Sequence, residues 1–216
     1  MTAEMSLHSF FPYFFVSAPA CVAKVILLIF SVFVICLMAA WYLVPKFLEQ
    51  PSYKVVQRDG NIEIRLYDII LLQSVSVSGD QYQALRQGFR PLVSYIGAKK
   101  RDGDKISMTA PVMQLPGDTQ DDWIISFSMP SKYDASSLPA PNNERVFTET
   151  IGPTKAAVIR FSGNADDKLL VKKTEQLSDW LNKAAFSAKS KPRYMFYNDP
   201  STPPFLRRNE VFIEIE

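Results

Sequence analysis

The segment KISMTAPVM, from Lys105 to Met113, says most about how this chain folds. An apolar strand begins at Ile106 and is interrupted by Pro111, whose ring fixes φ and requires Ala110 before it to be extended. Apolar residues resume at Val112. A short strand that stops at a proline and restarts directly after it is typical of a bend, so we predict a bend in a β-sheet here.

The residues on either side of this segment predict strands and one helix. NIEIRLY, from Asn61 to Tyr67, alternates apolar and polar residues like a half-buried strand, and a second strand follows from Ile69 to Val77. Apolar residues at helical spacing predict a helix from Asp80 to Ile96, with Asp80 as its N-cap. WIISFSM, from Trp123 to Met129, predicts another strand.

The second half of the chain repeats this order of elements. Strands are predicted at 145–150 and 155–161, a helix from Asp166 to about Ala185, and strands at 193–197 and 210–216. We therefore predict an α+β domain: a distorted antiparallel β-barrel of two pseudo-symmetric strand-strand-helix-strand halves with two flanking helices.

An uncharged apolar run from Val25 to Val44 precedes this domain. At about 1.5 Å per residue, about 20 residues span the roughly 30 Å of a hydrocarbon core, which predicts one transmembrane helix. Lys24 and Lys46 flank the run, as is common where amines reach the headgroups. The predicted organisation is an N-terminal tail (1–24), a transmembrane anchor (25–44), a linker (45–52) and a folded domain (53–216).

The position of this helix also suggests a location for the protein. Met38-Ala39-Ala40 is followed directly by Trp41, which is a poor signal-peptidase site, so we expect an uncleaved signal-anchor. A leading anchor usually exports the part of the chain that follows it. We therefore expect a single-pass protein of a bacterial inner membrane, with the C-terminal domain in the periplasm.

The composition excludes several classes of function. A net charge of +2 is close to balance, whereas nucleic-acid binders usually carry a clear excess of basic residues, so we expect no nucleic-acid partner. The two cysteines, Cys21 and Cys36, lie in or beside the apolar run, and the single histidine, His8, lies in the tail. The folded domain therefore has no residues for a Ser-His-Asp triad, a cysteine nucleophile or an imidazole-based zinc site.

Six segments of the domain, in order, resemble the SOUL haem-binding protein family, which is itself related to the effector-binding domains of gyrase-inhibitory proteins. The segments are EIRLY (63–67), GFRPLVSYI (88–96), KISMTAPV (105–112), FSMPSKY (127–133), FSG (161–163) and RNEV (208–211). The resemblance covers nearly everything from Tyr53 to Glu216. It implies a distorted barrel of two similar halves and non-covalent binding of haem or another porphyrin in an apolar groove beside the first helix, in a carrier or a buffer. No histidine of the domain is available to ligate the iron.

The resemblance suggests candidate ligand-binding residues in and near that groove. Arg65 and Lys105 would meet the propionates, while their ordinary roles are a cross-strand pair and a solvated strand end. The apolar candidates lie on the first helix and in the KISMTAPVM segment, and burial in an ordinary core is the alternative for each. These apolar candidates are Tyr82, Leu85, Phe89, Ile96, Met108 and Met113.

A small-molecule hydrolase on the same fold is the alternative function. It would use Glu210 with a tyrosine such as Tyr197, because a buried carboxylate with a raised pKa can act as a general acid or base. Strand alternation alone does not determine which face of the sheet Glu210 occupies. We favour the simpler role of an ion pair with Arg207 or Arg208.

Overall fold

The computed structural model describes residues 20–99, 101–119 and 121–216, and these residues belong to two compact units, 1–40 and 41–216. Most of the predicted N-terminal tail, including His8, lies outside the described residues. The first described element is a helix, α1 (Ala20–Phe47), which runs from the first unit into the second.

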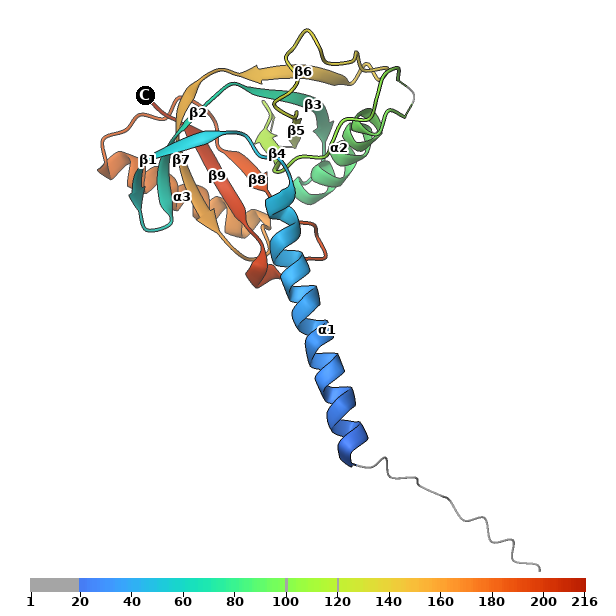
Figure 1. Ribbon diagram of the computed structural model, residues 1–216. Coiled ribbons are helices and arrows are strands. Elements are labelled where there is room, and N and C mark those ends of the chain that lie inside the picture. Colours follow the sequence, from blue (N-terminus) through green and yellow to red (C-terminus); the bar gives the residue numbers. More distant parts are fainter. Residues whose placement is uncertain (1–19, 100, 120) are drawn as a thin grey trace, which may run out of the picture. The chain divides into compact units, whose positions relative to one another are not determined.

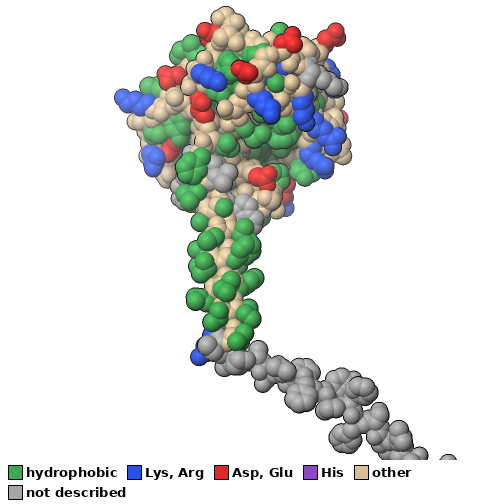
Figure 2. Space-filling model, turned by 45° about the vertical axis from the view of Figure 1, so that its right-hand side comes forward, with side chains coloured by type: hydrophobic (Ala, Val, Ile, Leu, Met, Phe, Trp, Pro, Cys, Tyr) green, Lys and Arg blue, Asp and Glu red, His purple; other side chains and the backbone are tan. Residues whose placement is uncertain are grey.

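The apolar run forms a helix, as predicted. Its most apolar window, Val22–Ala40, has a mean hydropathy of 2.8, and none of it is buried. Figure 2 shows hydrophobic side chains along the visible face of this helix. By length and composition the helix is able to cross a membrane, although a signal sequence near the N-terminus has the same properties.

The second unit is a curled antiparallel sheet that forms a half-barrel, open between its edge strands β1 and β6 (Figure 1). Among the described residues it has 9 strands in the order β1-β2-β7-β9-β8-β4-β5-β3-β6. The strands are β1 (Tyr53–Asp59), β2 (Ile62–Tyr67), β3 (Ile70–Ser78), β4 (Val112–Pro116), β5 (Asp122–Ser128), β6 (Val146–Ile151), β7 (Thr154–Phe161), β8 (Arg193–Phe196) and β9 (Asn209–Glu214).

The predicted repeat is present as two halves that exchange a strand. One half is β2, β3, the helix α2 (Gln81–Ile96), β4 and β5; the other is β6, β7, the helix α3 (Asp167–Lys183), β8 and β9. The halves meet where β4 pairs with β8. The first strand of each half pairs with the second strand of the other, since β2 pairs with β7 and β6 with β3. This exchange joins the two halves into one continuous sheet.

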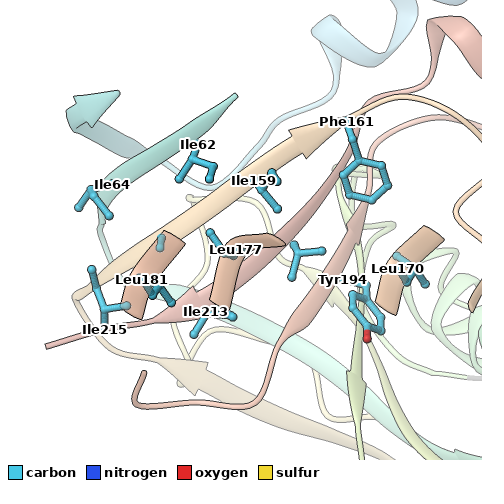
Figure 3. Close-up of a cluster of buried hydrophobic side chains, with 12 residues drawn as sticks. Ile62, Ile64, Ile159, Phe161, Leu170, Leu177, Leu181, Tyr194, Ile213 and Ile215 are labelled. Atoms are coloured by element: carbon cyan, nitrogen blue, oxygen red, sulfur yellow. The ribbon is translucent and has the colours of Figure 1, made fainter. Parts of the chain in front are cut away.

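Both helices cover the sheet with apolar stripes. Leu170, Leu177 and Leu181 of α3 are buried and pack against β7 and β9, as Figure 3 shows for Ile159 and Ile213. Full burial of one such side chain is worth about 1.5–3 kcal/mol. The helix α2 packs in the same way on β3 and β5. It begins at the predicted N-cap, where the Asp80 carboxylate accepts the Gln83 N–H.

A third apolar cluster lies on the opposite face of the sheet from α3. Strand alternation places Phe212 in this cluster, while its neighbours Val211 and Ile213 face α3. The concave face of the half-barrel is therefore a packed interior, in which Met113 is fully buried.

Two local features differ from the sequence-based expectation. β1 is an additional strand that pairs with β2, with an irregularity between Val55 and Gln57. The strand expected to begin at Ile106 is not formed, because the Ile106 N–H donates to Ile96 O at the end of α2 (2.8 Å) instead of to a neighbouring strand. Regular pairing begins only at Val112, after a cis peptide bond between Ala110 and Pro111.

Candidate functional site

The larger of the two cavities described in the second unit lies at one end of the half-barrel and has a volume of about 490 Å³. This volume falls within the range of roughly 300–1,000 Å³ that is usual for cofactor and ligand sites. Its apolar wall includes Ile69, Ile70, Leu71 and Met129, and Tyr133 contributes a half-buried ring. Five separate parts of the chain line the cavity: 49–52, 68–71, Thr109, the residues of 128–135 other than Lys132, and Thr150.

The wall formed by residues 49–52 is attached to the sheet by specific contacts. The Ala110 N–H donates to Glu49 O (2.9 Å), and the Glu49 carboxylate accepts the Ser131 N–H (2.6 Å). The Asp68 N–H donates to Ser52 O (3.3 Å). Residues 49–52 were expected to belong to a linker, and in the structure they form part of the folded domain and of its cavity.

The charged groups that line the cavity are acidic. Glu49, Asp68 and Asp134 contribute carboxylates, and no lysine or arginine is among the lining residues described. The Ser136 hydroxyl and the Ser137 N–H, which donate to Asp134, hold its pKa at about 2, so this carboxylate is ionised at neutral pH. A cation lies just beside the cavity, because Lys132 Nζ is 4.9 Å from the centroid of the Tyr133 ring.

A buried ionic cluster occupies the concave face of the sheet. Arg65 of β2 donates to both carboxylate oxygens of Glu210 in β9 (2.8 and 3.0 Å). Arg208 also donates to Glu210 (2.9 Å), and the Tyr197 hydroxyl donates to its other oxygen (2.8 Å). The exposed fraction is 1% for Arg65 and 0% for Glu210. Each charge in this cluster is therefore matched by an opposite charge, as buried charges require.

The contacts of the cluster determine the protonation states of its members. Burial alone would raise the pKa of Glu210, but the hydrogen bonds and charges of Arg65 and Arg208 outweigh this effect and lower it. Burial raises the pKa of Tyr197, and the negative charge of Glu210 raises it further. Glu210 is thus an ionised carboxylate whose two oxygens both accept hydrogen bonds, and it lacks the raised pKa required of a general acid.

This geometry does not favour the hydrolase hypothesis. Glu210 and Tyr197 are in contact, as that hypothesis requires, but both are buried and line neither of the two cavities described in the domain. The simpler prediction of an ion pair between Glu210 and Arg208 is confirmed. The contact with Arg65 was not foreseen, because the two residues are 145 positions apart and β7 lies between their strands.

The structure distributes the predicted ligand-binding residues over several places. On α2, Tyr82 is 59% exposed, Phe89 packs edge-on against Phe127, Leu85 is half-buried and Ile96 is buried. The remaining residues lie elsewhere: Met113 in the concave interior, Arg65 in the ionic cluster, and Lys105 and Met108 exposed on the segment before Thr109. None of the eight is among the residues that line the 490 Å³ cavity.

Sequence reasoning missed the residues of the cavity itself. The available signal was the FSMPSKY segment (127–133), five of whose residues line it: Ser128, Met129, Pro130, Ser131 and Tyr133. Thr109 of KISMTAPV lines the same cavity and donates to Ser128 O. A second cavity of about 320 Å³ lies between the N-terminal ends of α2 and α3 and contains none of the predicted residues.

Comparison with solved structures identifies the fold. The C-terminal domain of EcmrR has a TM-score of 0.55 at 12% identity, covering 76% of this chain and 98% of that one. A hydrolase from Listeria innocua has a TM-score of 0.54 at 12% identity, covering 74% and 94%. At these identities the similarity shows a shared fold and nothing about function.

Comparison of sequences identifies the family. Mouse "Heme-binding protein 1" is 27% identical over 136 residues, which is 61% of this chain and 71% of the mouse protein. The model of the family described as SOUL heme-binding protein matches residues 48–214. The match begins where the chain joins the folded domain, directly before the wall at 49–52, and continues to the last strand. The chain therefore belongs to the SOUL haem-binding protein family.

Proposed function

We propose that this protein is a membrane-anchored carrier or buffer of haem or a related porphyrin, and that it holds the ligand non-covalently in the 490 Å³ cavity. One observation carries the choice of site: two of the segments that resemble the family, KISMTAPV and FSMPSKY, meet in the wall of this cavity. The exposed face of α2, with Tyr82 and Phe89, is the alternative location.

The residues of the cavity fit the macrocycle of a porphyrin. Ile69, Leu71 and Met129 offer an apolar wall, as the faces of the ring require. Tyr133 and Met129 are of the residue types that ligate haem iron in other proteins, so the missing histidine does not exclude ligation. Bound haem would supply an iron centre and a strong visible absorption.

The charges of the cavity set the direction in which a haem would enter. Glu49, Asp68 and Asp134 would repel propionates placed deep in the cavity. The ring would therefore enter with its apolar edge first and leave its propionates at the opening, where Lys132 lies beside Tyr133. Arg65 has no part in this arrangement, because Glu210 and Glu63 already pair with it.

We propose the inner membrane of a bacterium, with the domain on the periplasmic side, as the location. The length of the apolar helix supports a membrane anchor. The poor signal-peptidase site at Met38-Ala39-Ala40, followed directly by Trp41, supports an anchor that is not cleaved.

Haemin titration of the full chain in detergent micelles tests both the function and the site. We expect a saturable shift of the Soret band. Ile69→Asp should weaken haemin binding by about tenfold or more, because an apolar contact worth about 1.5 kcal/mol is replaced by a fourth carboxylate. Ile69 is 65% exposed, so the fold should tolerate the change.

The matched control is Tyr82→Asp, at a similarly exposed position on α2 (59%). It should leave the affinity for haemin unchanged within about twofold, which is about 0.4 kcal/mol. A loss of binding in Tyr82→Asp but not in Ile69→Asp would move the site to the face of α2. A wild-type protein that binds no haemin at micromolar concentration would contradict the function itself.

A further inference from the structure

We propose that the cavity takes up and releases its ligand directly at the surface of a lipid bilayer, without passage of the ligand through bulk water. This inference rests on the proposed function and adds a partner to it, namely the membrane itself. Its basis is the way in which the chain leaves the apolar helix and enters the wall of the cavity.

The connection between helix and cavity contains almost no free chain. The helix α1 ends at Phe47, and the first residue that lines the cavity is Glu49. Consecutive Cα atoms are about 3.8 Å apart, so these two residues are separated by no more than about 8 Å. The distance from Val44, the last residue of the apolar run, to Glu49 is at most about 19 Å.

The contacts of Glu49 fix the end of this short connection to the domain. Its carbonyl oxygen and its carboxylate are both bound, to Ala110 and Ser131 respectively. Glu49 and Thr109 also form an isolated parallel bridge. The segment after the helix is therefore attached to the cavity wall. If the helix crosses a bilayer with Val44 at the edge of the hydrocarbon core, the length of the chain keeps Glu49 within about 19 Å of that edge, in or close to the headgroup region, which extends about 5–8 Å from it.

The surface around this end of the domain is suited to a bilayer interface. Ile69, in the wall of the cavity, is 65% exposed, and Met108, next to the bridged Thr109, is 47% exposed. Both are large apolar side chains that lose contact with water when they enter the headgroup region. Because the lining carboxylates repel anionic lipids, we expect a neutral lipid surface to suffice.

The ligand class agrees with this placement. A porphyrin is a flat apolar ring with carboxylates on one edge, and an amphiphile of this shape partitions to the interface between water and hydrocarbon. The cavity matches such a ligand in chemistry, because its interior and its edge are apolar. It also matches in position, because a short connection joins it to the membrane helix.

The test is to lift the domain away from the membrane without altering the cavity. Four EAAAK repeats inserted between Lys46 and Phe47 would extend the helix by about 30 Å. The wild-type chain and this variant are reconstituted in phosphatidylcholine vesicles loaded with haemin, and the Soret band of the protein is followed over time. The same repeats inserted after Gly60, in the exposed β1–β2 turn at the end of β1 away from the lining residues 49–52, are the control.

We expect the lifted variant to acquire haemin at least about tenfold more slowly, which corresponds to about 1.4 kcal/mol in the barrier. The Gly60 insertion should transfer haemin at the wild-type rate. A soluble haem scavenger in the buffer should inhibit the lifted variant and leave the wild-type protein unaffected. All three proteins should bind haemin in detergent with equal affinity.

Other results would contradict transfer at the membrane or the proposed function. Equal transfer rates for the lifted variant and the wild-type protein, or equal inhibition of both by the scavenger, would overturn transfer at the membrane while leaving haem binding in place. A failure of the wild-type protein to bind haemin in detergent would overturn the proposed function and this inference together.

Discussion

The ionic cluster on the concave face and the cavity at the end of the half-barrel are both rich in charge, but they differ in how the charges are satisfied. In the cluster, Arg65 and Arg208 both bind the fully buried Glu210. In the cavity, Asp68 and Asp134 lie at an open surface and have no lysine or arginine beside them in the lining. Removing one partner of a buried, fully paired charge destabilises a fold, whereas accessible charges can meet a ligand.

The comparison assigns stability to the cluster and binding to the cavity. A hydrogen bond connects the two regions, because Arg208 donates to the side chain of Gln50 (3.1 Å) and Gln50 also lines the cavity. Substitutions in each region, and at their boundary, test whether the two roles are separate.

The largest effect is expected for Glu210→Gln. This change removes the negative charge that Arg65 and Arg208 share, and breaking a buried ion pair from one side typically costs about 3–5 kcal/mol. Urea unfolding of the variant should show this loss in the free energy of unfolding. Its affinity for haemin under folding conditions should stay within about twofold of wild type, or about 0.4 kcal/mol.

Glu63→Gln is the matched control for this prediction. Glu63 also pairs with Arg65, but its side chain keeps 15% of its surface exposed, so water can replace part of the lost contact. Its loss of stability should be clearly smaller than that of Glu210→Gln. Equal losses in the free energy of unfolding would mean that burial does not distinguish the two carboxylates. If Glu210→Gln has the stability of the wild type, the ionic cluster does not stabilise the fold.

A smaller effect is expected from acid, and its sign follows from the pKa of Glu210. Because the folded protein lowers this pKa below its ordinary value of 4.5, the unfolded chain binds the proton more readily than the folded one. The stability contributed by Glu210 is therefore fully present above about pH 4.5 and is lost as the pH falls through the lowered pKa.

The measurement is the free energy of unfolding in urea at several pH values between about 6 and 3. Other carboxylates with lowered pKa values, such as Asp134, contribute to the slope of both proteins, so the difference between wild type and Glu210→Gln isolates Glu210. This difference should shrink as the pH falls. A difference that stays constant over the range would show that Glu210 takes up no proton there.

The sequence predicted the elements of this fold better than it predicted the site. Local signals were sufficient for Asp80 as the N-cap of α2 and for the leucine stripe of α3, because capping and helical periodicity depend on neighbouring residues. The strand expected at Ile106 failed because its N–H binds the end of α2, a tertiary contact that alternation does not reveal.

The site depends on contacts between distant segments. The face of Glu210 was ambiguous from alternation, since both faces of β9 are buried and its strongest partner, Arg65, lies on a strand 145 residues earlier. The cavity is assembled from parts of the chain as far apart as Glu49 and Thr150. Family resemblance marked two of these parts, but it did not show that they meet.

The smallest effect is expected at the boundary residue, in Gln50→Ala. The variant loses one hydrogen bond to Arg208, but Glu210 still pairs with that guanidinium and water has access to it, so the loss of stability should be about 1 kcal/mol. The affinity for haemin should change by less than about threefold, or about 0.65 kcal/mol, because the apolar wall at Ile69 and Met129 is intact.

Gln50→Glu is expected to act in opposite directions on the two regions, on stability through the cluster and on haemin binding through the cavity. A carboxylate at this position gives Arg208 a second anionic partner, which should keep or raise the free energy of unfolding. The same charge is a fourth carboxylate in the cavity wall, beside Glu49, Asp68 and Asp134, so it should weaken haemin binding. Urea unfolding and haemin titration of the two variants measure both effects. If Gln50→Glu lowers stability and binding together, or if Gln50→Ala weakens binding as strongly as Ile69→Asp, then the cluster and the cavity act as one unit, and the buried charges belong to the ligand site after all.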